Sequence, residues 1–315
     1  MFEMQTLSRQ RIVVLAGGDS SERDVSLVSG GCVVEALQSR GHQCRLVDPA
    51  RNPLIQVDWK QIDVCFNALH GGAGEDGTIQ EQLRRLNVPY TGSGPTASRL
   101  AISKSASKER FTQVGVPTLP YMLLHDSESM SDVAARVGSL GYPLVIKPDS
   151  QGSSLGVTVS DHPGRLQHAL VQGSLFESFL IAEPWVRGRE FTVALLDRRP
   201  LPVIEIVPSG EMFDFQAKYQ SDTTALRAEN ELPDQLCYRL AEVAHDAASS
   251  LGTRGLARVD MILDEFDCLW VLEVNTVPGL TRHSLAPMGA KQAGMDFATL
   301  CEWMLAGALA AEVRQ

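Results

Sequence analysis

Residues 258–275, RVDMILDEFDCLWVLEVN, constrain the fold more than any other part of this chain. Two apolar runs, MIL and LWVL, flank the polar segment DEFDC, a pattern typical of an antiparallel β-hairpin with buried strands. Side chains two apart on a strand share a face, so Arg258 points with Asp260, and Glu273 with Asn275. If Asp260 pairs with Glu273, Arg258 pairs with Asn275. We therefore expect two opposed carboxylates, with their Cβ atoms roughly 4.5–5.5 Å apart.

This pair of acids predicts a metal site. Two carboxylates so close together repel each other, or one of them holds a proton. A divalent cation bound by two carboxylates and an amide oxygen removes the conflict, and oxygen ligands of this kind suit Mg²⁺ or Mn²⁺. We therefore expect Asp260, Glu273 and Asn275 to be metal ligands. The alternative is a solvated hairpin face with unconnected acids.

Alternating strands and helices in the first third of the chain predict a parallel sheet covered on both faces. Later segments predict two further units, and we expect domains at 1–103, 104–187 and 188–315. The predicted strands are 11–16, 44–47, 64–69, 144–146, 181–186 and 191–196, besides the hairpin at 257–274. The predicted helices are 22–41, 79–86, 98–114, 233–251 and 297–313, and residues 208–224 read as irregular.

Two loops carry groups suited to a nucleotide. Lys147 ends a predicted strand and precedes GSSLG, so an ammonium, two hydroxyls and exposed backbone N–H groups can surround phosphate oxygens. This is no Walker loop, because the lysine precedes the glycines. In EPWVRGRE, free backbone groups at a strand end can pair with an adenine edge, while Glu183 or Glu190 accepts ribose hydroxyls. An ordinary Gly-Ser loop and an edge strand with solvated acids are the alternatives.

Three single residues each have two interpretations. Glu22, at a predicted helix N-terminus, either caps the helix, where the dipole stabilises a carboxylate, or holds a ligand's ammonium. Ser284, in TRHSLAP, is a capping or turn residue or a binding group. His70, in the glycine-rich HGGAGEDG, is a packing histidine or a base.

Composition excludes several classes of protein. The formal net charge of −10 argues against a general nucleic-acid binder, which needs a basic face. The six cysteines are scattered without a C-x-x-C pair, which favours reduced thiols over a zinc site or disulfide framework. Because neither a signal peptide nor an apolar run of about 18 residues is evident, we expect a cytoplasmic protein that does not bind membranes.

Seven segments occur in an order that resembles the D-alanine–D-alanine ligases, a family of the ATP-grasp superfamily. They are GGDSSERDVS, ALHGGAGEDGTIQ, PYTGSG, KPDSQGSSLGV, AKYQSD, RVD and LEVNTVPGLTRHSLAPMGAKQAG. The resemblance covers about residues 11–300 and implies an α/β (α+β) ATP-grasp fold of three domains. It implies a parallel sheet in the first domain and ATP held between the antiparallel sheets of the other two. The implied reaction joins two D-alanines through an acyl phosphate, for peptidoglycan precursor synthesis.

The resemblance also assigns residues to ATP and to two Mg²⁺ or Mn²⁺ ions. Asp260, Glu273 and Asn275 match the metal ligands, in agreement with the hairpin. The residues assigned to the nucleotide are Lys104, Lys147, Ser154, Glu183, Val186, Glu190 and Lys218.

Further matches concern the two D-alanines. Glu22 matches the acid that holds the first ammonium, and Ser153 and Tyr219 match its hydrogen-bonding partners, which order a loop over the site. Arg258 and the backbone N–H of Gly279 match the oxyanion donors. The residues assigned to the second substrate's carboxylate are Ser284 and the backbone N–H of Leu285, and His70 is assigned to the substrate site.

Departures from the family pattern put loop closure and nucleotide affinity in question. Phe213 and Phe215 stand where tyrosines are commoner, Met212 where an aromatic residue is expected, and Pro184 where lysine is usual. Tyr219 in AKY favours the dipeptide ligases, because ligases that use D-lactate typically carry a histidine in that loop.

Other functions remain as alternatives. A D-alanine–D-lactate or D-alanine–D-serine ligase, or another ATP-grasp carboxylate–amine ligase, would share the fold. RIVVLAGG suggests an NAD oxidoreductase, but no G-x-G-x-x-G follows. An inactive nucleotide-binding paralogue is disfavoured, because every metal and phosphate position is filled. The resemblance further implies a homodimer.

Overall fold

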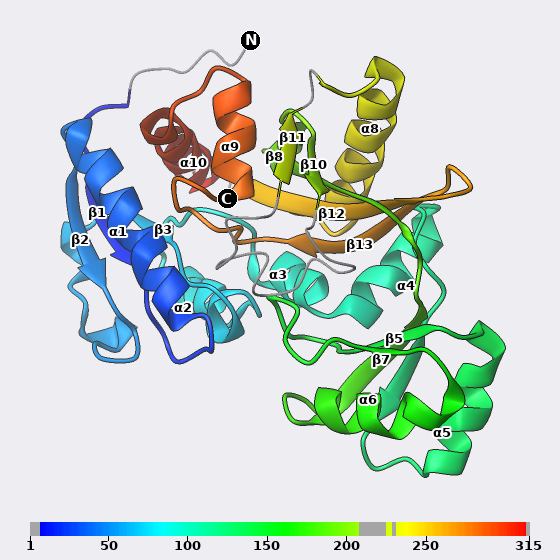
Figure 1. Ribbon diagram of the computed structural model, residues 1–315. Coiled ribbons are helices and arrows are strands. Elements are labelled where there is room, and N and C mark those ends of the chain that lie inside the picture. The colour runs from blue at the N-terminus through cyan, green and yellow to red at the C-terminus, as the bar shows by residue number, and fades with distance from the viewer. Residues whose placement is uncertain (1–6, 208–224, 229–230, 313–315) are drawn as a thin grey trace.

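The described part of the chain forms three sheets (Figure 1). The structure is a computed structural model, and it describes residues 7–207, 225–228 and 231–312. One sheet is parallel and the other two are antiparallel, which confirms the predicted α/β (α+β) class.

The N-terminal sheet is parallel, in the order β2-β1-β3. Its strands are β1 (Arg11–Leu15), β2 (Gln43–Val47) and β3 (Val64–Asn67). Ile12 and Val14 face one apolar cluster while Val13 and Leu15 face another, as alternation along a doubly covered strand requires. The surrounding helices are α1 (Arg23–Ser39), α2 (Thr78–Arg85), α9 (Leu285–Gln292) and α10 (Phe297–Glu312).

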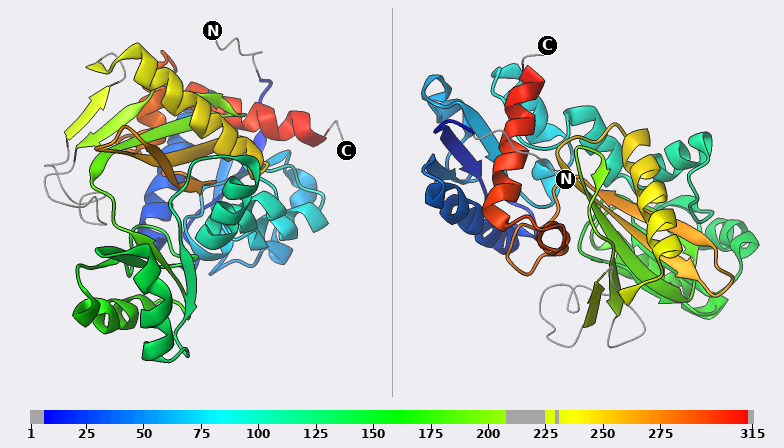
Figure 2. Two further views of the ribbon diagram at one scale, coloured as in Figure 1. Left: turned by 90° about the vertical axis from the view of Figure 1, so that its right-hand side faces the viewer. Right: turned by 90° about the horizontal axis from the view of Figure 1, so that it is seen from above.

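Helix α10, near the C-terminus, packs against the N-terminal sheet. Its Leu300, Met304 and Leu305 share a buried cluster with Ile12 and Phe66 of the first sheet. Figure 2 shows α10 lying beside the N-terminal strands. The last helix therefore completes the core of the first sheet.

The central sheet is antiparallel, in the order β4-β7-β5-β6, and lies apart from the others at the lower right of Figure 1. Its apolar core includes Leu144, Ile146, Leu180 and Ala182. Its elements are β4 (Met122–His125), α5 (Met130–Val137), β5 (Leu144–Pro148), β6 (Thr158–Ser160), α6 (Leu166–Ser174) and β7 (Phe179–Pro184). Short 3₁₀ helices span Gly138–Leu140 and Pro163–Arg165 in this unit, and Leu54–Gln56, Trp59–Gln61 and Gly72–Gly74 in the N-terminal part of the chain.

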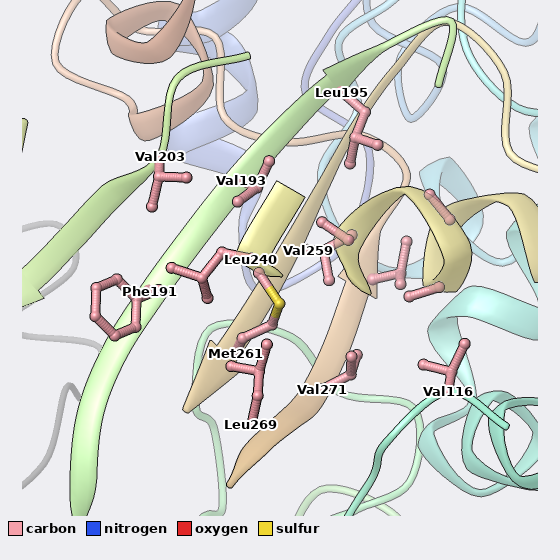
Figure 3. Close-up of a cluster of buried hydrophobic side chains, with 14 of the residues drawn as sticks. Val116, Phe191, Val193, Leu195, Val203, Leu240, Val259, Met261, Leu269 and Val271 are labelled. Carbon is pink, nitrogen blue, oxygen red and sulfur yellow. The ribbon is translucent and has the colours of Figure 1, made fainter. Parts of the chain in front are cut away.

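The third sheet has the order β11-β10-β8-β12-β13, and β9 pairs with β8. Its elements are β8 (Gly188–Leu196), β9 (Arg199–Pro200), β10 (Ile204–Val207), β11 (Ala225–Ala228), α8 (Asp234–Ser250), β12 (Leu256–Asp264) and β13 (Leu269–Asn275). Figure 3 shows Val193, Val259 and Met261 on one face of this sheet with Leu240 of α8. These side chains are buried in one apolar cluster, which fixes the hairpin in place.

One predicted helix was wrong. In place of a single helix over 98–114, the chain forms α3 (Pro95–Ile102) and α4 (Lys104–Val114), separated at Ser103. Ser103 has extended backbone angles, and its hydroxyl accepts a hydrogen bond from the N–H of Ala106, which caps α4. Both helices contribute side chains to the core of the third sheet, so packing crosses the domain limit predicted at 103.

Candidate functional site

A cavity of about 410 Å³ lies between the central and third sheets. Six of the seven residues assigned to the nucleotide line it, together with Asp260 and Glu273. Those six are Lys104, Lys147, Ser154, Glu183, Val186 and Glu190. Apolar side chains that the sequence did not single out complete the lining, among them Trp185, Met261 and Leu272. A mainly apolar pocket with a few convergent charged groups fits a nucleotide.

The β12–β13 hairpin has the predicted register at Asp260, and the pairing shifts by one residue between Asp260 and Met261. Asp260 lies opposite Glu273, and Arg258 lies opposite Asn275. Arg258 donates to both carboxylate oxygens of Asp260, at 2.9 and 2.7 Å. Thr192, on the adjacent strand β8, also donates to Asp260, at 2.7 Å. The carboxylate of Asp260 is therefore oriented by two neighbours before any ligand arrives.

The predicted metal ligands fit a hard divalent cation in their chemistry. Asp260 and Glu273 supply carboxylate oxygens that face the same cavity, and Asn275 follows on the same strand face as Glu273. The amide oxygen of Asn275 accepts a hydrogen bond from the N–H of Val277 at 2.9 Å. Within the described ranges, no group of three or more His, Cys, Asp or Glu is placed to hold a metal.

Lys104 is the first residue of α4, and its side chain lines the cavity. Its ammonium donates to the carbonyl of Gln151 at 2.7 Å and lies 3.9 Å from Glu273. Burial lowers the pKa of Lys104, and the neighbouring acid Glu273 opposes that effect. Asp149 ties the start of α4 to the loop after β5, because it accepts from the Ser105 N–H at 2.7 Å. Lys104 is thereby fixed against the loop that follows Lys147.

Lys147 and Glu183 are direct partners in the cavity. The ammonium of Lys147 lies 2.5 Å from one oxygen of Glu183, and Lys108 forms an ion pair with the other oxygen. Burial alone would raise the pKa of Glu183, but Lys147 and Lys108 outweigh it and the pKa is lowered. The predicted phosphate lysine and the predicted adenine-site acid therefore form one buried charged group.

The Gly-Ser loop brings Ser153 to Glu22. Glu22 is the N-cap residue of α1 but makes no capping hydrogen bond, which excludes the capping interpretation for its side chain. Its carboxylate instead accepts a hydrogen bond from the hydroxyl of Ser153. Ser153 and Ser154 both have positive φ, at 52° and 57°, conformations that cost about 1–3 kcal/mol each in non-glycine residues. The loop holds a strained backbone where it meets Glu22.

Glycines make room for the carboxylate of Glu22. A Cβ atom on Gly71 would lie 2.7 Å from Oε2 of Glu22, and one on Gly152 would lie 3.1 Å from the same atom. Gly71 also has a φ of +66°, which favours glycine. The HGG and QGS segments thus both approach the same oxygen of a single acid.

His70 is buried and held by two partners. Its Nδ1 lies 3.1 Å from the carbonyl of Val277, and its Nε2 lies 2.9 Å from the hydroxyl of Ser29. Burial lowers the pKa of His70 to about 4, with the Val277 bond opposing and Arg258 adding to the effect. A neutral imidazole with a hydrogen-bond partner at each ring nitrogen favours the interpretation of His70 as a packing residue over its interpretation as a catalytic base.

Gly279, Ser284 and Leu285 lie together at the start of α9. A Cβ atom on Gly279 would lie 2.8 Å from the hydroxyl oxygen of Ser284. Ser284 is the N-cap residue but makes no side-chain capping bond, and its hydroxyl accepts from the Thr281 N–H at 3.1 Å. Leu285 is the first helical residue, and an N–H at a helix N-terminus suits a carboxylate.

Several predicted residues lie outside the described ranges. They are Lys218 and Tyr219, together with the departures Met212, Phe213 and Phe215. The departure at Pro184 is described: this residue ends β7 opposite Leu144, beside the cavity.

Two buried residues of the site were missed by sequence reasoning. Lys108 follows Lys104 by four residues, and this spacing on one helix face was a usable signal. Glu75 lies in HGGAGEDG, where its carboxylate accepts from the Gly71 N–H at 3.1 Å. Burial, with Glu22 nearby, raises the pKa of Glu75 to about 8. No local pattern separates Glu75 from an ordinary loop acid.

Two antiparallel sheets around a lysine-lined cavity, with opposed carboxylates on the hairpin, define an ATP-grasp protein. Comparisons give the family. Residues 111–306 match the model of the D-ala D-ala ligase C-terminus, and residues 49–93 match that of the N-terminus. The chain therefore belongs to the D-alanine–D-alanine ligase family, and the predicted family and fold are confirmed.

Individual relatives agree over nearly the whole length. The chain is 42% identical over 302 residues to a D-alanine–D-alanine ligase of Bordetella avium, covering 95% of this chain and 94% of that protein. It is 40% identical over 291 residues to one of Laribacter hongkongensis, covering 92% and 94%. A crystal structure of the Bacillus anthracis ligase complexed with ATP superimposes with a TM-score of 0.86 at 30% identity, covering 97% and 99%. Over the described ranges, no helix is long and apolar enough to cross a membrane.

Proposed function

We propose that this chain joins two D-alanine molecules through an acyl phosphate, which forms by transfer of the γ-phosphoryl group of ATP, so that ADP and phosphate are released. One observation carries the proposal: the Glu22 carboxylate of the first part of the chain meets Ser153 of the Gly-Ser loop. An acid suited to an ammonium is thereby placed next to a loop suited to phosphates. A D-alanine held at Glu22 would lie beside this loop, whose Ser154 lines the cavity.

The first half of the reaction needs charge neutralisation. A free carboxylate is too poor an electrophile to acylate an amine, so its oxygen attacks the γ-phosphorus and ADP leaves. Lys147 and Lys104 line the cavity and offset the negative charge of the transferring group. Residues 208–224, which the family resemblance assigns to a loop over the site, lie outside the described residues.

The second half needs an oxyanion site. The neutral amine of the second D-alanine attacks the acyl carbon, the C–O bond to phosphate breaks, and the amine loses a proton. Arg258 and the N–H of Gly279 are the proposed oxyanion donors, each contributing about 10²–10³-fold in comparable sites. Ser284 and the N–H of Leu285 are proposed to hold the carboxylate of the second substrate.

Two Mg²⁺ or Mn²⁺ ions are proposed as cofactors. Asp260, Glu273 and Asn275 would hold them, and the ions would supply further charge neutralisation on the ATP phosphates. The oxygen donor set supports this assignment.

The decisive experiment measures phosphate release by the purified protein from ATP and Mg²⁺. D-Alanine alone, D-alanine with D-lactate, D-alanine with D-serine, and L-alanine are compared, and products are identified by mass spectrometry. D-Alanyl-D-alanine is expected as the main product. A majority of D-alanyl-D-lactate or D-alanyl-D-serine would favour the rival substrates, and no phosphate release with any pair would contradict the proposal.

The family resemblance also supports a homodimer acting in a bacterial cytoplasm. Sedimentation velocity of the purified protein measures the first property: a single species near twice the 34.3 kDa chain mass is expected. A species at the chain mass over a wide concentration range would contradict the dimer.

A further inference from the structure

Lys108 is a charged side chain with no solvent contact. It lies on α4, one turn after Lys104, and its exposed fraction is 0%. Its ammonium donates to the hydroxyl of Thr118 at 2.8 Å and to the carbonyl of Leu119 at 3.4 Å. It also forms an ion pair with Glu183. A lysine this deeply buried is rare unless its charge is paired.

Glu183 divides its two oxygens between two lysines. Oε1 contacts Lys108, and Oε2 lies 2.5 Å from the ammonium of Lys147. The two lysines differ in access, because Lys147 and Glu183 line the cavity whereas Lys108 does not. The acid itself is only 2% exposed. A phosphate in the cavity can therefore reach Lys147, whereas Lys108 remains paired with Glu183.

We propose that Lys108 is a positioning residue for the nucleotide, acting as the permanent counter-charge of Glu183 so that Lys147 can be shared with a phosphate. This inference rests on the proposed function, because it takes the cavity to be the ATP site. When Lys147 turns to a phosphate oxygen, Glu183 keeps one ammonium partner. Without Lys108, the same movement would leave a buried carboxylate with neither lysine.

The energetic argument compares two states of the cavity. Removing one partner of a buried ion pair is strongly unfavourable, because the remaining charge is left uncompensated. In Lys108→Met, Lys147 would be left as the direct ion-pair partner of Glu183 among the described residues, and phosphate would have to compete for it. In Lys108→Met/Glu183→Gln, the carboxylate that pairs with Lys147 is absent, so Lys147 is free for phosphate again.

The experiment measures binding of the non-hydrolysable β,γ-methylene analogue of ATP, with Mg²⁺, by calorimetry. Wild type, Lys108→Met, Glu183→Gln and the double variant are compared without D-alanine. Lys108→Met is expected to weaken binding by about ten- to a hundredfold. The double variant is expected to bind within about threefold of Glu183→Gln. The KM for ATP should rise in Lys108→Met more than kcat falls.

Two outcomes would overturn the inference. One is unchanged binding in a folded Lys108→Met protein. The other is a double variant that binds at least tenfold more weakly than Glu183→Gln, since a merely structural lysine would be needed whether or not residue 183 is charged. If Lys108→Met does not fold, the comparison of the double variant with Glu183→Gln still tests the proposed role of Lys108.

Thr118→Val provides a matched control. It removes the hydroxyl that accepts from Lys108 and donates to the carbonyl of Val271 at 3.0 Å, without changing any charge. Binding close to wild type is expected, and a loss as large as that in Lys108→Met would overturn the electrostatic role. Because binding is measured without D-alanine, failure of this inference is distinct from failure to form the dipeptide.

Discussion

The hydroxyl of Ser153 donates a hydrogen bond to the carboxylate of Glu22, although 131 residues separate them in the chain. The bond links the N-cap of α1 to the strained loop after β5. It therefore fixes the acid proposed to hold the first substrate relative to the loop proposed to hold the phosphates.

Loss of this bond should weaken the first substrate site. Ser153→Ala leaves the Glu22 carboxylate without its oriented donor, and a hydrogen bond to a charged group contributes about 1.5–3 kcal/mol. We expect the D-alanine KM at saturating ATP to rise about tenfold or more, with a smaller change in the KM for ATP. Steady-state kinetics measure both. Ser154 is the neighbouring residue that lines the cavity, so Ser154→Ala should raise the KM for ATP more than the KM for D-alanine. Equal effects of the two variants on both KM values would contradict the assignment.

Two adjacent glycines in α1 should respond to alanine in opposite directions. A Cβ atom on Gly30 would lie 2.4 Å from that of Ala16 in the loop after β1, whereas one on Gly31 meets nothing within 4 Å. Gly30→Ala should therefore lower the free energy of unfolding by about 1–3 kcal/mol through overpacking. Gly31→Ala should raise it by about 0.5–1 kcal/mol, because alanine favours the helix. Urea unfolding of both variants checks the pair, and a stabilised Gly30→Ala protein would rule out the close α1–β1 approach.

Local patterns predicted the parts of this molecule that depend on nearby residues. The hairpin register followed from side-chain alternation around one turn, and the structure has Asp260 opposite Glu273. The break at Ser103 was missed because Asp149 fixes the start of α4 from 46 residues away. The Lys108–Glu183 pair joins α4 to β7, which lie far apart in the chain. The four-residue spacing of Lys104 and Lys108 indicates a shared helix face, but it does not identify the partner on another element.

The opposed carboxylates of the hairpin should be needed for turnover. Glu273→Gln removes one negative charge from the proposed metal site while keeping the shape of the side chain. We expect kcat to fall by about 100-fold or more, and the concentration of Mg²⁺ giving half-maximal activity to rise. Circular dichroism should show an unchanged fold. Near-normal turnover in a folded Glu273→Gln protein would rule out this residue as a metal ligand.

Glu75 should make stability depend on pH between about 5 and 8. Its pKa of about 8 in the folded chain lies above the ordinary value near 4.3, so the folded chain keeps a proton that the unfolded chain has released. Rising pH therefore favours unfolding until the pKa of the folded chain is passed. Glu75→Gln cannot titrate there, so its stability relative to wild type should rise by up to about 1 kcal/mol per pH unit.

Thermal and urea unfolding at pH 5, 6.5 and 8 in metal-free buffer provide the measurement. The charged and titratable groups that act on Glu75 are Glu22, Glu273, Arg258 and the neighbouring His70. Glu22→Gln serves as a control that removes the nearest repelling acid, and it should reduce the pH dependence without abolishing it. Parallel stability curves for wild type and Glu75→Gln would contradict the raised pKa.

The contact between Gly279 and Ser284 should determine how the second substrate is held. A Cβ atom at position 279 would lie 2.8 Å from the Ser284 hydroxyl oxygen, closer than such atoms normally approach. Gly279→Ala should therefore push Ser284 off its bond with the Thr281 N–H and away from the proposed carboxylate site. Because Gly279 is also a proposed oxyanion donor, both kcat and the second D-alanine's KM should worsen. Gly289→Ala in α9, where the nearest atom is 3.4 Å away, is the matched control and should leave both values near wild type. If Gly279→Ala changed only the KM for ATP, the second substrate would have to bind elsewhere.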